Sequence, residues 1–394
     1  MTIFFTISII YPMDNLPTPE NAALISSQKL SELIQQKIQQ QNNWLSFADY
    51  MQMALYTPDY GYYTGGAQKF GRDGDFITAP VLTPLFGQTL ALQLDALLPQ
   101  TAGNIYEFGA GTGHLAASVL PALHSQHFQH YYIIELSVEL AQRQREYIQT
   151  HAPDQIHKVT HLTQLPEQFD GILIGNEVLD AMPVPVYLRQ ANQITEMGVS
   201  WLDNQFVWQD KSASSAAIQQ VMETFPDTAE PYQSELHPQQ YAFVATLAQK
   251  LKRGAMIWID YGFDEAQYYH VQRRQGTLIG HYRHHTVHDP FFYPGLTDLT
   301  AHVNFTRIAD AGIDNHLDLI GYTNQATFLL NLGITELLAK TGKPEENAYI
   351  QTASACHTLL DAHEMGELFK VIAFGKNIDV DWQGFMYGDL CHKL

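Results

Sequence analysis

The feature that most constrains the fold is an alternation of short apolar segments with segments of helical periodicity, beginning near residue 104. The apolar segments typical of strands are 104–108, 131–134, 157–162, 171–175 and 256–259. The helical patterns around them are 85–98, 115–123, 138–150 and 238–252. Because neighbouring parallel strands need long crossover connections, usually helices, this alternation predicts a doubly wound α/β fold with a mostly parallel sheet.

The remaining segments indicate additions to this core. Residues 185–209 are rich in Val, Tyr and Trp and predict antiparallel hairpins, whereas 325–340 and 347–362 predict helices and 369–374 a last strand. We expect four parts. Residues 1–100 form an N-terminal extension and cap that contributes a loop to a ligand site, and residues 101–270 form the core with a hairpin insertion near 185–209. Residues 271–362 form a mainly helical insertion or substrate region, and residues 363–394 contain the last core strands and a C-terminal tail.

Charge and cysteine content narrow the classes of function. The chain has 21 Lys and Arg against 41 Asp and Glu, a net charge of −20 at pH 7. This balance argues against a protein whose main task is to bind nucleic acid, and it suits cationic partners. The two cysteines, Cys356 and Cys391, are too few for a disulfide framework or a four-cysteine zinc site. We therefore expect a cytoplasmic protein.

The beginning of the chain has no pattern of a membrane span or signal peptide. The apolar run at 3–11 is too short to cross a bilayer, and it lacks a basic region before it and a cleavage site after it. We expect translation to begin at Met13, with residues 1–12 an unstructured extension. An N-terminal strand is the alternative.

The strongest local signal is the turn after the first predicted core strand, which reads Glu107-Phe-Gly109-Ala-Gly111-Thr-Gly113. Glycines at such a turn allow the backbone to approach a ligand closely. The spacing differs from the G-x-G-x-x-G of dinucleotide-binding dehydrogenases, so a diphosphate is not the expected ligand. Glu135 ends the second strand, where its carboxylate can accept hydrogen bonds from both hydroxyls of a ribose. The alternative is an ordinary glycine-rich turn between a strand and a helix.

A second signal follows the fourth predicted strand, where Asn176, Glu177 and Asp180 occur close together. Reactive groups in doubly wound sheets lie beyond the carboxyl ends of the strands. Paired carboxylates suit a cationic nucleophile such as a guanidinium, which they bind through forked hydrogen bonds. The alternative is a helix N-cap formed by Asn176 with Glu177 in the first turn.

Two further segments carry candidate residues. The segment 70–80, which contains Asp75 and Thr78, has glycines and polar groups that can close over a bound ligand, although an ordinary turn is the alternative. Histidines 281, 284, 285 and 288 would share one face of a helix, which is a pattern for a metal site. Pro290 and Gly295 follow closely, so we favour structural or substrate-facing histidines and expect no metal.

Taken in order, several blocks of the chain resemble the MidA-like methyltransferase family, which includes a mitochondrial complex I assembly factor that methylates an arginine. The blocks are GRDGDFITAP, YEFGAGTGHLA, NEVLDAMPV, WIDYGF, GTLIGHYRHHTVHDPFFYPGLTDLTAHVNF, GYTNQATFLLNLGI and EMGELFKVIAFGK. The resemblance covers roughly residues 45–376. The chain has Ala110 and Thr112 where the family often has proline and arginine. It has Tyr322 or Asn324 where the family often has glutamine.

The resemblance implies a class I methyltransferase fold, a seven-stranded Rossmann-like sheet with a helical insertion, and S-adenosyl-L-methionine as cofactor. By position, Glu107 and the glycines of its turn would hold the cofactor, Glu135 its ribose, and Thr78 and Asp75 its flank. Asn176, Glu177 and Asp180 would face the methyl acceptor.

The function that we expect from the resemblance is methylation of a protein arginine by direct displacement, with a respiratory complex subunit as one candidate acceptor. A methyltransferase acting on a small molecule or another side chain is an alternative. A cofactor-binding assembly factor with little turnover is another.

Overall fold

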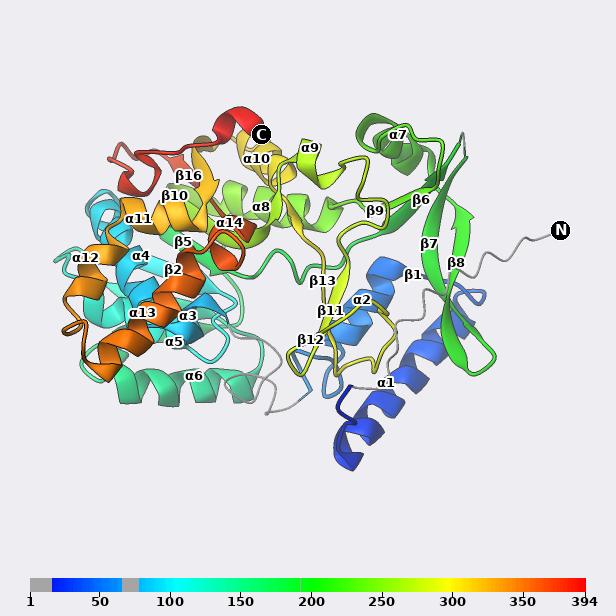
Figure 1. The fold of residues 1–394 in the computed structure, drawn as a ribbon, viewed down its shortest axis with the longest axis horizontal. Helices are drawn as coiled ribbons and strands as arrows, with labels where there is room; N and C mark the ends of the chain where they lie inside the picture. Colours follow the sequence, from blue (N-terminus) through cyan, green and yellow to red (C-terminus); the bar gives the residue numbers. More distant parts are fainter. Residues whose placement is uncertain (1–15, 66–77, 192) are drawn as a thin grey trace.

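The computed structural model describes residues 16–65, 78–191 and 193–394 of the chain, which form three sheets with helices around them (Figure 1). Residues 1–12, for which we expect an unstructured extension, and the candidate residue Asp75 lie outside the described residues. No helix of the described part is long and apolar enough to cross a membrane.

The central sheet is mostly parallel and runs in the order β15-β16-β10-β5-β2-β3-β4, with β14 also paired to β10. Its strands are β2 (Asn104–Phe108), β3 (His130–Ile134), β4 (Val159–Leu162), β5 (Phe169–Asn176), β10 (Leu251–Phe263), β14 (Val303–Asn304), β15 (Asp318–Asn324) and β16 (Phe369–Lys376). Strands β16 and β15 are antiparallel to their neighbours. The predicted α/β class is confirmed, and the sheet has eight strands rather than seven because β14 pairs with the end of β10.

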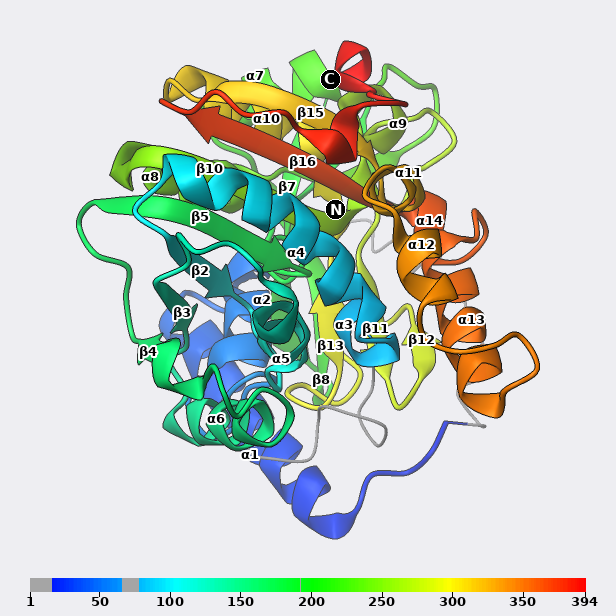
Figure 2. The same cartoon turned by 90° about the vertical axis from the view of Figure 1, so that its left-hand side faces the viewer.

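Helices cover both faces of this sheet, as the doubly wound prediction requires (Figure 2). One face packs on α4 (Leu85–Leu97), α5 (His114–Val119), α6 (Val138–His151), α11 (Gln325–Asn331), α12 (Ile334–Ala339), α13 (Asn347–Leu360) and α14 (Met365–Leu368). The other face packs on α8 (Pro238–Lys250) and α10 (Phe305–Asp314). Strands β5, β10 and β16 are buried along nearly their whole length, which explains their continuous apolar runs.

The N-terminal segment and the predicted hairpins form one antiparallel sheet. Its order is β1-β7-β6-β9, with β8 paired to β7. The strands are β1 (Leu45–Ser46), β6 (Val186–Gln190), β7 (Gln193–Leu202), β8 (Gln205–Ser212) and β9 (Tyr232–Glu235). Helices α1 (Asn21–Gln40) and α2 (Phe47–Tyr56) pack on it through a separate apolar cluster. The cap is therefore joined to the hairpins through strand pairing that no local pattern indicated.

The range 271–362 is less helical than predicted in its first third. It begins with a small antiparallel sheet of β11 (Ile279–Tyr282), β12 (His285–Val287) and β13 (Asp298–Thr300), and only later contains α10 to α13. The short helices not yet given are α3 (Ala79–Leu82), α7 (Ser215–Thr224), α9 (Glu265–Tyr268) and five 3-10 turns, Leu98–Gln100, Leu120–Ala122, Ile156–Lys158, Gln383–Phe385 and Cys391–Lys393.

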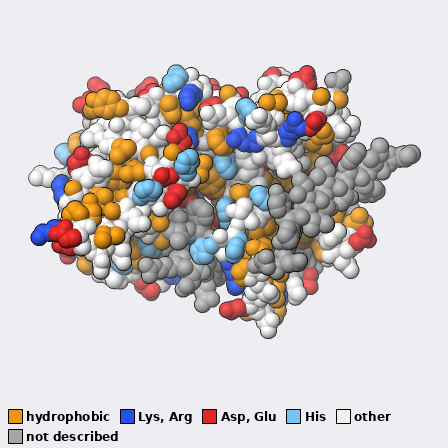
Figure 3. Space-filling model, viewed as in Figure 1, with side chains coloured by type: hydrophobic (Ala, Val, Ile, Leu, Met, Phe, Trp, Pro, Cys, Tyr) orange, Lys and Arg blue, Asp and Glu red, His pale blue; other side chains and the backbone are white. Residues whose placement is uncertain are grey.

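The four clustered histidines lie on a hairpin, so the shared helix face is wrong. Arg283 and His284 both have positive φ values, 46° and 64°, and connect β11 to β12 as a two-residue hairpin turn. Histidine side chains gather along the middle of the face in Figure 3. Within the described ranges, no three His, Cys, Asp or Glu side chains are placed to hold a metal ion.

We expect Gly175→Ala to destabilise the sheet where β5 approaches the candidate site. A Cβ atom there would lie 2.4 Å from Cζ3 of the buried Trp258 ring on β10. Overpacking of this kind costs about 1–3 kcal/mol of unfolding free energy, measured by urea denaturation. Gly375→Ala on β16 is the matched control, because its Cβ would meet only Ile side-chain atoms at 3.2 Å or more. Equal losses in both variants would contradict this packing argument.

Candidate functional site

Most of the predicted site residues meet at one edge of the central sheet. Parallel strands end on the same side, so β2, β3 and β5 deliver the glycine turn, Glu135 and the Asn176–Asp180 turn to this edge. Thr78 lies directly before α3. Helix α3 packs against α5, the helix that follows the glycine turn. Asp75 is outside the described residues.

The glycine turn has the backbone shape that only glycine adopts readily. Gly109, Gly111 and Gly113 have φ values of 66°, 52° and 91°. A Cβ at Gly109 would lie 2.7 Å from Cγ2 of Val178, so this glycine allows the β2 and β5 turns to touch. A Cβ at Gly111 would have nothing within 4 Å. Gly111 therefore presents open backbone, as a cradle for a ligand requires.

Gln144, on α6, ties the glycine turn to Glu135. Its amide nitrogen donates to the Gly111 carbonyl at 2.9 Å and to Oε2 of Glu135 at 3.0 Å. Its oxygen pairs with Nε2 of His161 at 3.0 Å. With both donors used, the amide has a fixed orientation. Gln144 was not predicted as a site residue. The signal in the sequence was a polar residue on the buried face of α6, four positions before Ile148.

Glu135 keeps acceptor capacity after these contacts. The backbone N–H of Ser137 donates to its Oε1 at 2.8 Å, and burial raises the pKa of its carboxyl. A carboxylate has about four acceptor positions, so hydroxyls of a ribose can still bind. The side chains of Leu136 and Val138 are 78% and 85% exposed, which leaves apolar surface beside it that a nucleobase can cover. This edge fits the predicted cofactor.

Glu107 is buried beneath the turn. Its Oε2 accepts a hydrogen bond of 2.7 Å from the hydroxyl of Tyr131, and burial raises the pKa of Glu107 to about 8. Its predicted role at the cofactor stays a prediction, and its observed contact joins β2 to β3.

The turn after β5 is irregular rather than helical. No helix follows Asn176 before β6, so the alternative of a helix N-cap is wrong. Glu177 has a φ of 54°, and its backbone N–H donates to the carbonyl of Ile259 at 2.9 Å. The amide of Asn176 donates to Oε1 of Glu177 at 3.0 Å. A left-handed non-glycine residue costs about 1–3 kcal/mol and is typical of functional sites.

Asp260, on β10 directly after the last residue that pairs with β5, holds this turn. Its Oδ2 accepts from the backbone N–H groups of Val178, Leu179 and Asp180 at 3.1, 2.9 and 3.3 Å. Burial raises the pKa of Asp260 well above its usual range, and the charges of Asp180 and Glu177 add to the rise. Asp260 was not predicted as a site residue, although an acid directly after the apolar run 256–259 was a usable signal.

Two predicted carboxylates of the turn lie close to Asp260, with Asp180 buried and Glu177 half-buried. The hydroxyl of Tyr261 donates to Oδ2 of Asp180 at 2.6 Å. Burial raises the pKa of Asp180 to about 6 and that of Glu177 to about 8, with Asp180 adding to the latter rise. None of the ion pairs found in the described ranges involves Glu177, Asp180 or Asp260.

Residues of the cap and of β13 form a wall beside this turn. The hydroxyl of Tyr56 donates to the carbonyl of Ala181 at 3.0 Å, and that of Tyr63 donates to Oδ1 of Asp298 at 2.9 Å. The two rings stack with centroids 5.5 Å apart. The structure thus surrounds the acidic turn with tyrosines, which sequence reasoning did not assign to the site.

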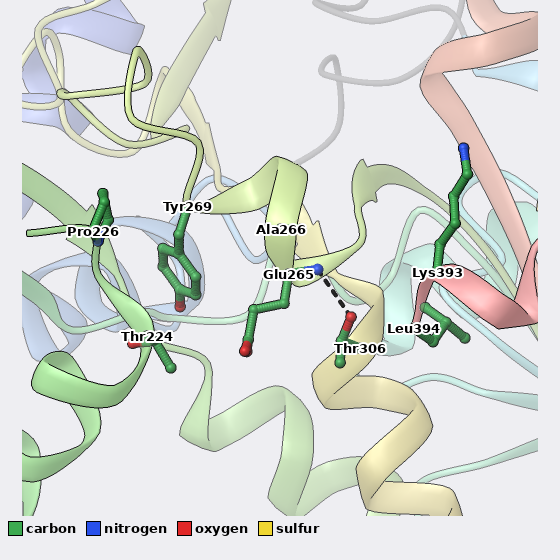
Figure 4. A pocket seen from close by; sticks show the side chains of 8 residues that line it. All are labelled: Thr224, Pro226, Glu265, Ala266, Tyr269, Thr306, Lys393 and Leu394. Carbon is green, nitrogen blue, oxygen red and sulfur yellow. Dashed lines mark hydrogen bonds between the residues drawn. The ribbon is translucent and has the colours of Figure 1, made fainter.

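A surface pocket lies apart from these residues (Figure 4). It is lined by Thr224, Pro226, Glu265, Ala266, Tyr269, Thr306, Lys393 and Leu394. The backbone N–H of Glu265 donates to Oγ1 of Thr306 at 2.9 Å in its wall. None of the predicted site residues lines it, so it forms no part of the candidate site.

Comparisons with known proteins place this arrangement in context. A family model described as "Putative S-adenosyl-L-methionine-dependent methyltransferase" matches residues 85–323. The mitochondrial protein arginine methyltransferase NDUFAF7 of Danio rerio is 28% identical over 370 residues, covering 83% of this chain and 82% of the relative. NDUFAF7 of Homo sapiens is 26% identical over 376 residues, covering 84% of this chain and 79% of the relative.

A solved structure is more similar still. The crystal structure of a Burkholderia thailandensis protein bound to S-adenosyl-homocysteine superposes with a TM-score of 0.92. It is 45% identical to this chain, and the match covers 96% of this chain and all of the other, 100%.

We expect Glu135→Ala to weaken binding of S-adenosyl-L-methionine at least ~10-fold, because two charge-assisted hydrogen bonds of about 1.5–3 kcal/mol each would be lost. Calorimetric titration measures the affinity. Glu139→Ala is the control, since Glu139 is an exposed acid in the first turn of α6, close to Glu135 in the chain, and its ion pair in the described ranges is with Arg143. Unchanged affinity in Glu135→Ala would exclude the ribose role.

Gly111→Val is expected to abolish binding of the same cofactor while the protein still folds. The new side chain would fill the open space at the turn without striking protein atoms, although its positive φ adds strain. Circular dichroism checks the fold and calorimetry the affinity. Normal affinity in a folded variant would remove the glycine turn from the cofactor site.

We expect Glu107 to make the unfolding free energy depend on pH. Its pKa is about 8 in the folded chain against 4.5 when exposed, so the folded state favours the protonated form. The contribution of protonated Glu107 to the unfolding free energy is complete below pH ~4.5. As the pH rises to ~8 this contribution is lost, and the unfolding free energy falls by a few kcal/mol. In Glu107→Gln the unfolding free energy should decrease less over the same pH range, as measured by urea denaturation at several pH values. Parallel curves for both proteins would refute this assignment.

Proposed function

This chain belongs to the family of S-adenosyl-L-methionine-dependent methyltransferases, and we propose that it methylates the guanidinium group of an arginine in a protein. The observation that carries the choice of acceptor is the acidic cluster of buried Asp180, buried Asp260 and half-buried Glu177, with no ion-pair partner in the described ranges. Relatives of this chain are named protein arginine methyltransferases, which supports the same choice.

A cationic acceptor would offset the cost of burying these charges. Ionised carboxylates that share a buried site repel one another, which raises their pKa values. A guanidinium lowers them again, because it supplies the opposite charge, and its planar fork matches carboxylate oxygens. We infer that Glu177 and Asp180 bind the acceptor and that Asp260 shapes the turn that carries them.

The bound cofactor would supply an electrophilic methyl group, which passes to the acceptor nitrogen by direct displacement as the sulfur–methyl bond breaks and S-adenosyl-homocysteine leaves. The chain's own residues supply alignment, an effect worth as much as ~7–11 kcal/mol of the barrier. An arginine keeps its proton before reaction, since its pKa exceeds ~12. The proton is therefore released as the nitrogen–carbon bond forms or afterwards, and we infer that the carboxylate of Glu177 accepts it.

The setting of the reaction belongs to the same proposal. We infer that the seven strands of the main sheet path form the class I methyltransferase sheet, with β14 as an addition. A reducing location, the cytoplasm, is supported by two free cysteines, Cys356 and Cys391. The curated relatives are named mitochondrial. A respiratory complex subunit remains our candidate acceptor, and cell fractionation with methylarginine mass spectrometry tests both points.

Two other functions make different predictions in one assay. Cell lysate from a strain lacking the protein, incubated with purified protein and labelled cofactor, should yield labelled protein bands containing methylarginine. A labelled small molecule or another modified side chain would favour a different acceptor. No labelled product with intact cofactor binding would favour an assembly factor with little turnover.

We expect Glu177→Gln and Asp180→Asn to separate acceptor chemistry from cofactor binding. Both variants should bind S-adenosyl-L-methionine within ~3-fold of the wild type, since a 3-fold change is only ~0.7 kcal/mol. Methyl transfer should fall ~100-fold or more, because a misaligned acceptor loses much of the proximity effect. Calorimetry and the lysate assay provide the two measurements. Full activity in both variants would remove the guanidinium site and the preference for arginine.

A further inference from the structure

We propose that Tyr261 is a positioning residue, whose hydroxyl fixes one oxygen of Asp180 and leaves the other as the acceptor of a hydrogen bond from the methyl-accepting group. The proposal rests on the proposed function for the identity of that group. Tyr261 lies at the carboxyl end of β10 and was assigned no role by sequence.

Two consecutive residues of β10 act on the same turn. Asp260 accepts from the three backbone N–H groups of Val178, Leu179 and Asp180, whereas Tyr261 donates to the side chain of Asp180. One strand thus fixes both the main chain and a carboxylate of the turn. The backbone N–H of Ala301, just after β13, adds a third restraint by donating to the Asp180 carbonyl at 3.0 Å.

The Tyr261 ring is itself held on two sides. It contacts the Phe369 ring edge-on at 5.5 Å and the His302 ring edge-on at 5.0 Å between centroids. Phe369 is the strand partner of Tyr261 in the antiparallel pairing of β10 with β16. Because the ring is held on two sides, the Tyr261 hydroxyl has a fixed position and fixes Oδ2 of Asp180. Reactive groups need such support from neighbouring side chains.

A second observation points to a ligand at this turn. Asp180 is only 4% exposed, yet its Oδ1 has no hydrogen-bond partner among the described residues. Oδ1 of Asn176, four residues earlier, is also buried and unpartnered within the described ranges. Leaving one such acceptor unpaired costs about 1–3 kcal/mol, and a guanidinium carries five N–H donors that can satisfy both.

The charged and titratable groups around Asp180 come from several elements. Glu177 lies on its own turn, Asp260 and Tyr261 on β10, and Asp298 on β13. Tyr56 and Tyr63 of the cap also face it, and burial raises the pKa values of both phenols.

His302 lies behind Tyr261 and stays neutral near pH 7. Burial lowers its pKa to about 4, with Arg273 and Lys370 adding to the effect. It therefore brings no positive charge to Asp180 at the pH of the assay.

The hydrogen bond from Tyr261 also affects the ionisation of Asp180. Burial raises the pKa of this carboxyl to about 6, and the Tyr261 hydroxyl opposes the rise by stabilising the charged form. Removing the hydroxyl should therefore raise the pKa further. Less of the ionised, cation-binding form would then be present at neutral pH.

The test compares Tyr261→Phe with Tyr322→Phe. Tyr322, on β15, is also buried, and its hydroxyl has no partner among the described residues, so its loss should change neither measurement. NMR titration of labelled Asp carboxyl groups, assigned with Asp180→Asn, should show a higher pKa for Asp180 in Tyr261→Phe only. The acid limb of the pH–rate profile should move upward with it.

Turnover in Tyr261→Phe at pH 7 should fall at least ~10-fold, since small misplacements can cost ~100-fold, while cofactor affinity stays within ~3-fold. In an Asp180→Asn background the Tyr261→Phe change should have no further effect. An unchanged Asp180 pKa and rate would overturn the proposal. A parallel loss of affinity and turnover, or an equal effect in Asp180→Asn, would assign Tyr261 to general stability instead.

The NMR result does not depend on the identity of the acceptor. If the wild-type protein methylates another group, the proposed arginine activity fails while a raised Asp180 pKa in Tyr261→Phe still supports positioning. If arginine is methylated and the pKa stays unchanged, the positioning proposal fails alone.

Discussion

The acidic side of the site depends on the hydrogen bonds that three backbone N–H groups donate to the Asp260 carboxylate. Strands β5 and β10 run parallel, with Asn176 paired to Ile259, so the residue after Ile259 lies beside the turn that follows β5. Three N–H donors compensate part of the cost of burying this carboxylate. They also fix the main chain of residues 178–180, and with it the positions of the Glu177 and Asp180 carboxyl groups.

The glycine turn and the acidic turn are joined by direct packing. Gly109 has no Cβ, and Cγ2 of Val178 occupies the space that one would need. The backbone that cradles the cofactor and the backbone that carries the acceptor-binding acids therefore share a contact. Alignment between two bound reactants requires this kind of rigid link, because proximity effects are lost with displacements of about 1 Å. Gln144 extends the link to Glu135 on the far side.

The parts that sequence predicted well depend on local patterns. Strand β2 begins and ends where its apolar run does, at Asn104 and Phe108, and the glycine turn follows directly. The parts that it missed depend on contacts between distant residues: Asp260 with the turn after β5, and Leu45 with Val199. The histidine interpretation failed because helical spacing was assumed where Arg283 and His284 form a hairpin turn with positive φ. No periodicity within one segment could reveal a carboxylate supplied from another strand.

The position of β16 has a consequence for how the molecule is made. This strand, Phe369–Lys376, lies between β10 and β15 in the interior of the central sheet, yet it follows all the other described strands in the chain. A growing chain can form β2 to β5 early, but residues 254–261 of β10 gain β16 as their neighbour only after residue 376 has been made. A premature stop codon before residue 369 would thus remove an internal strand rather than an edge, and such fragments should be substrates for chaperones and proteases.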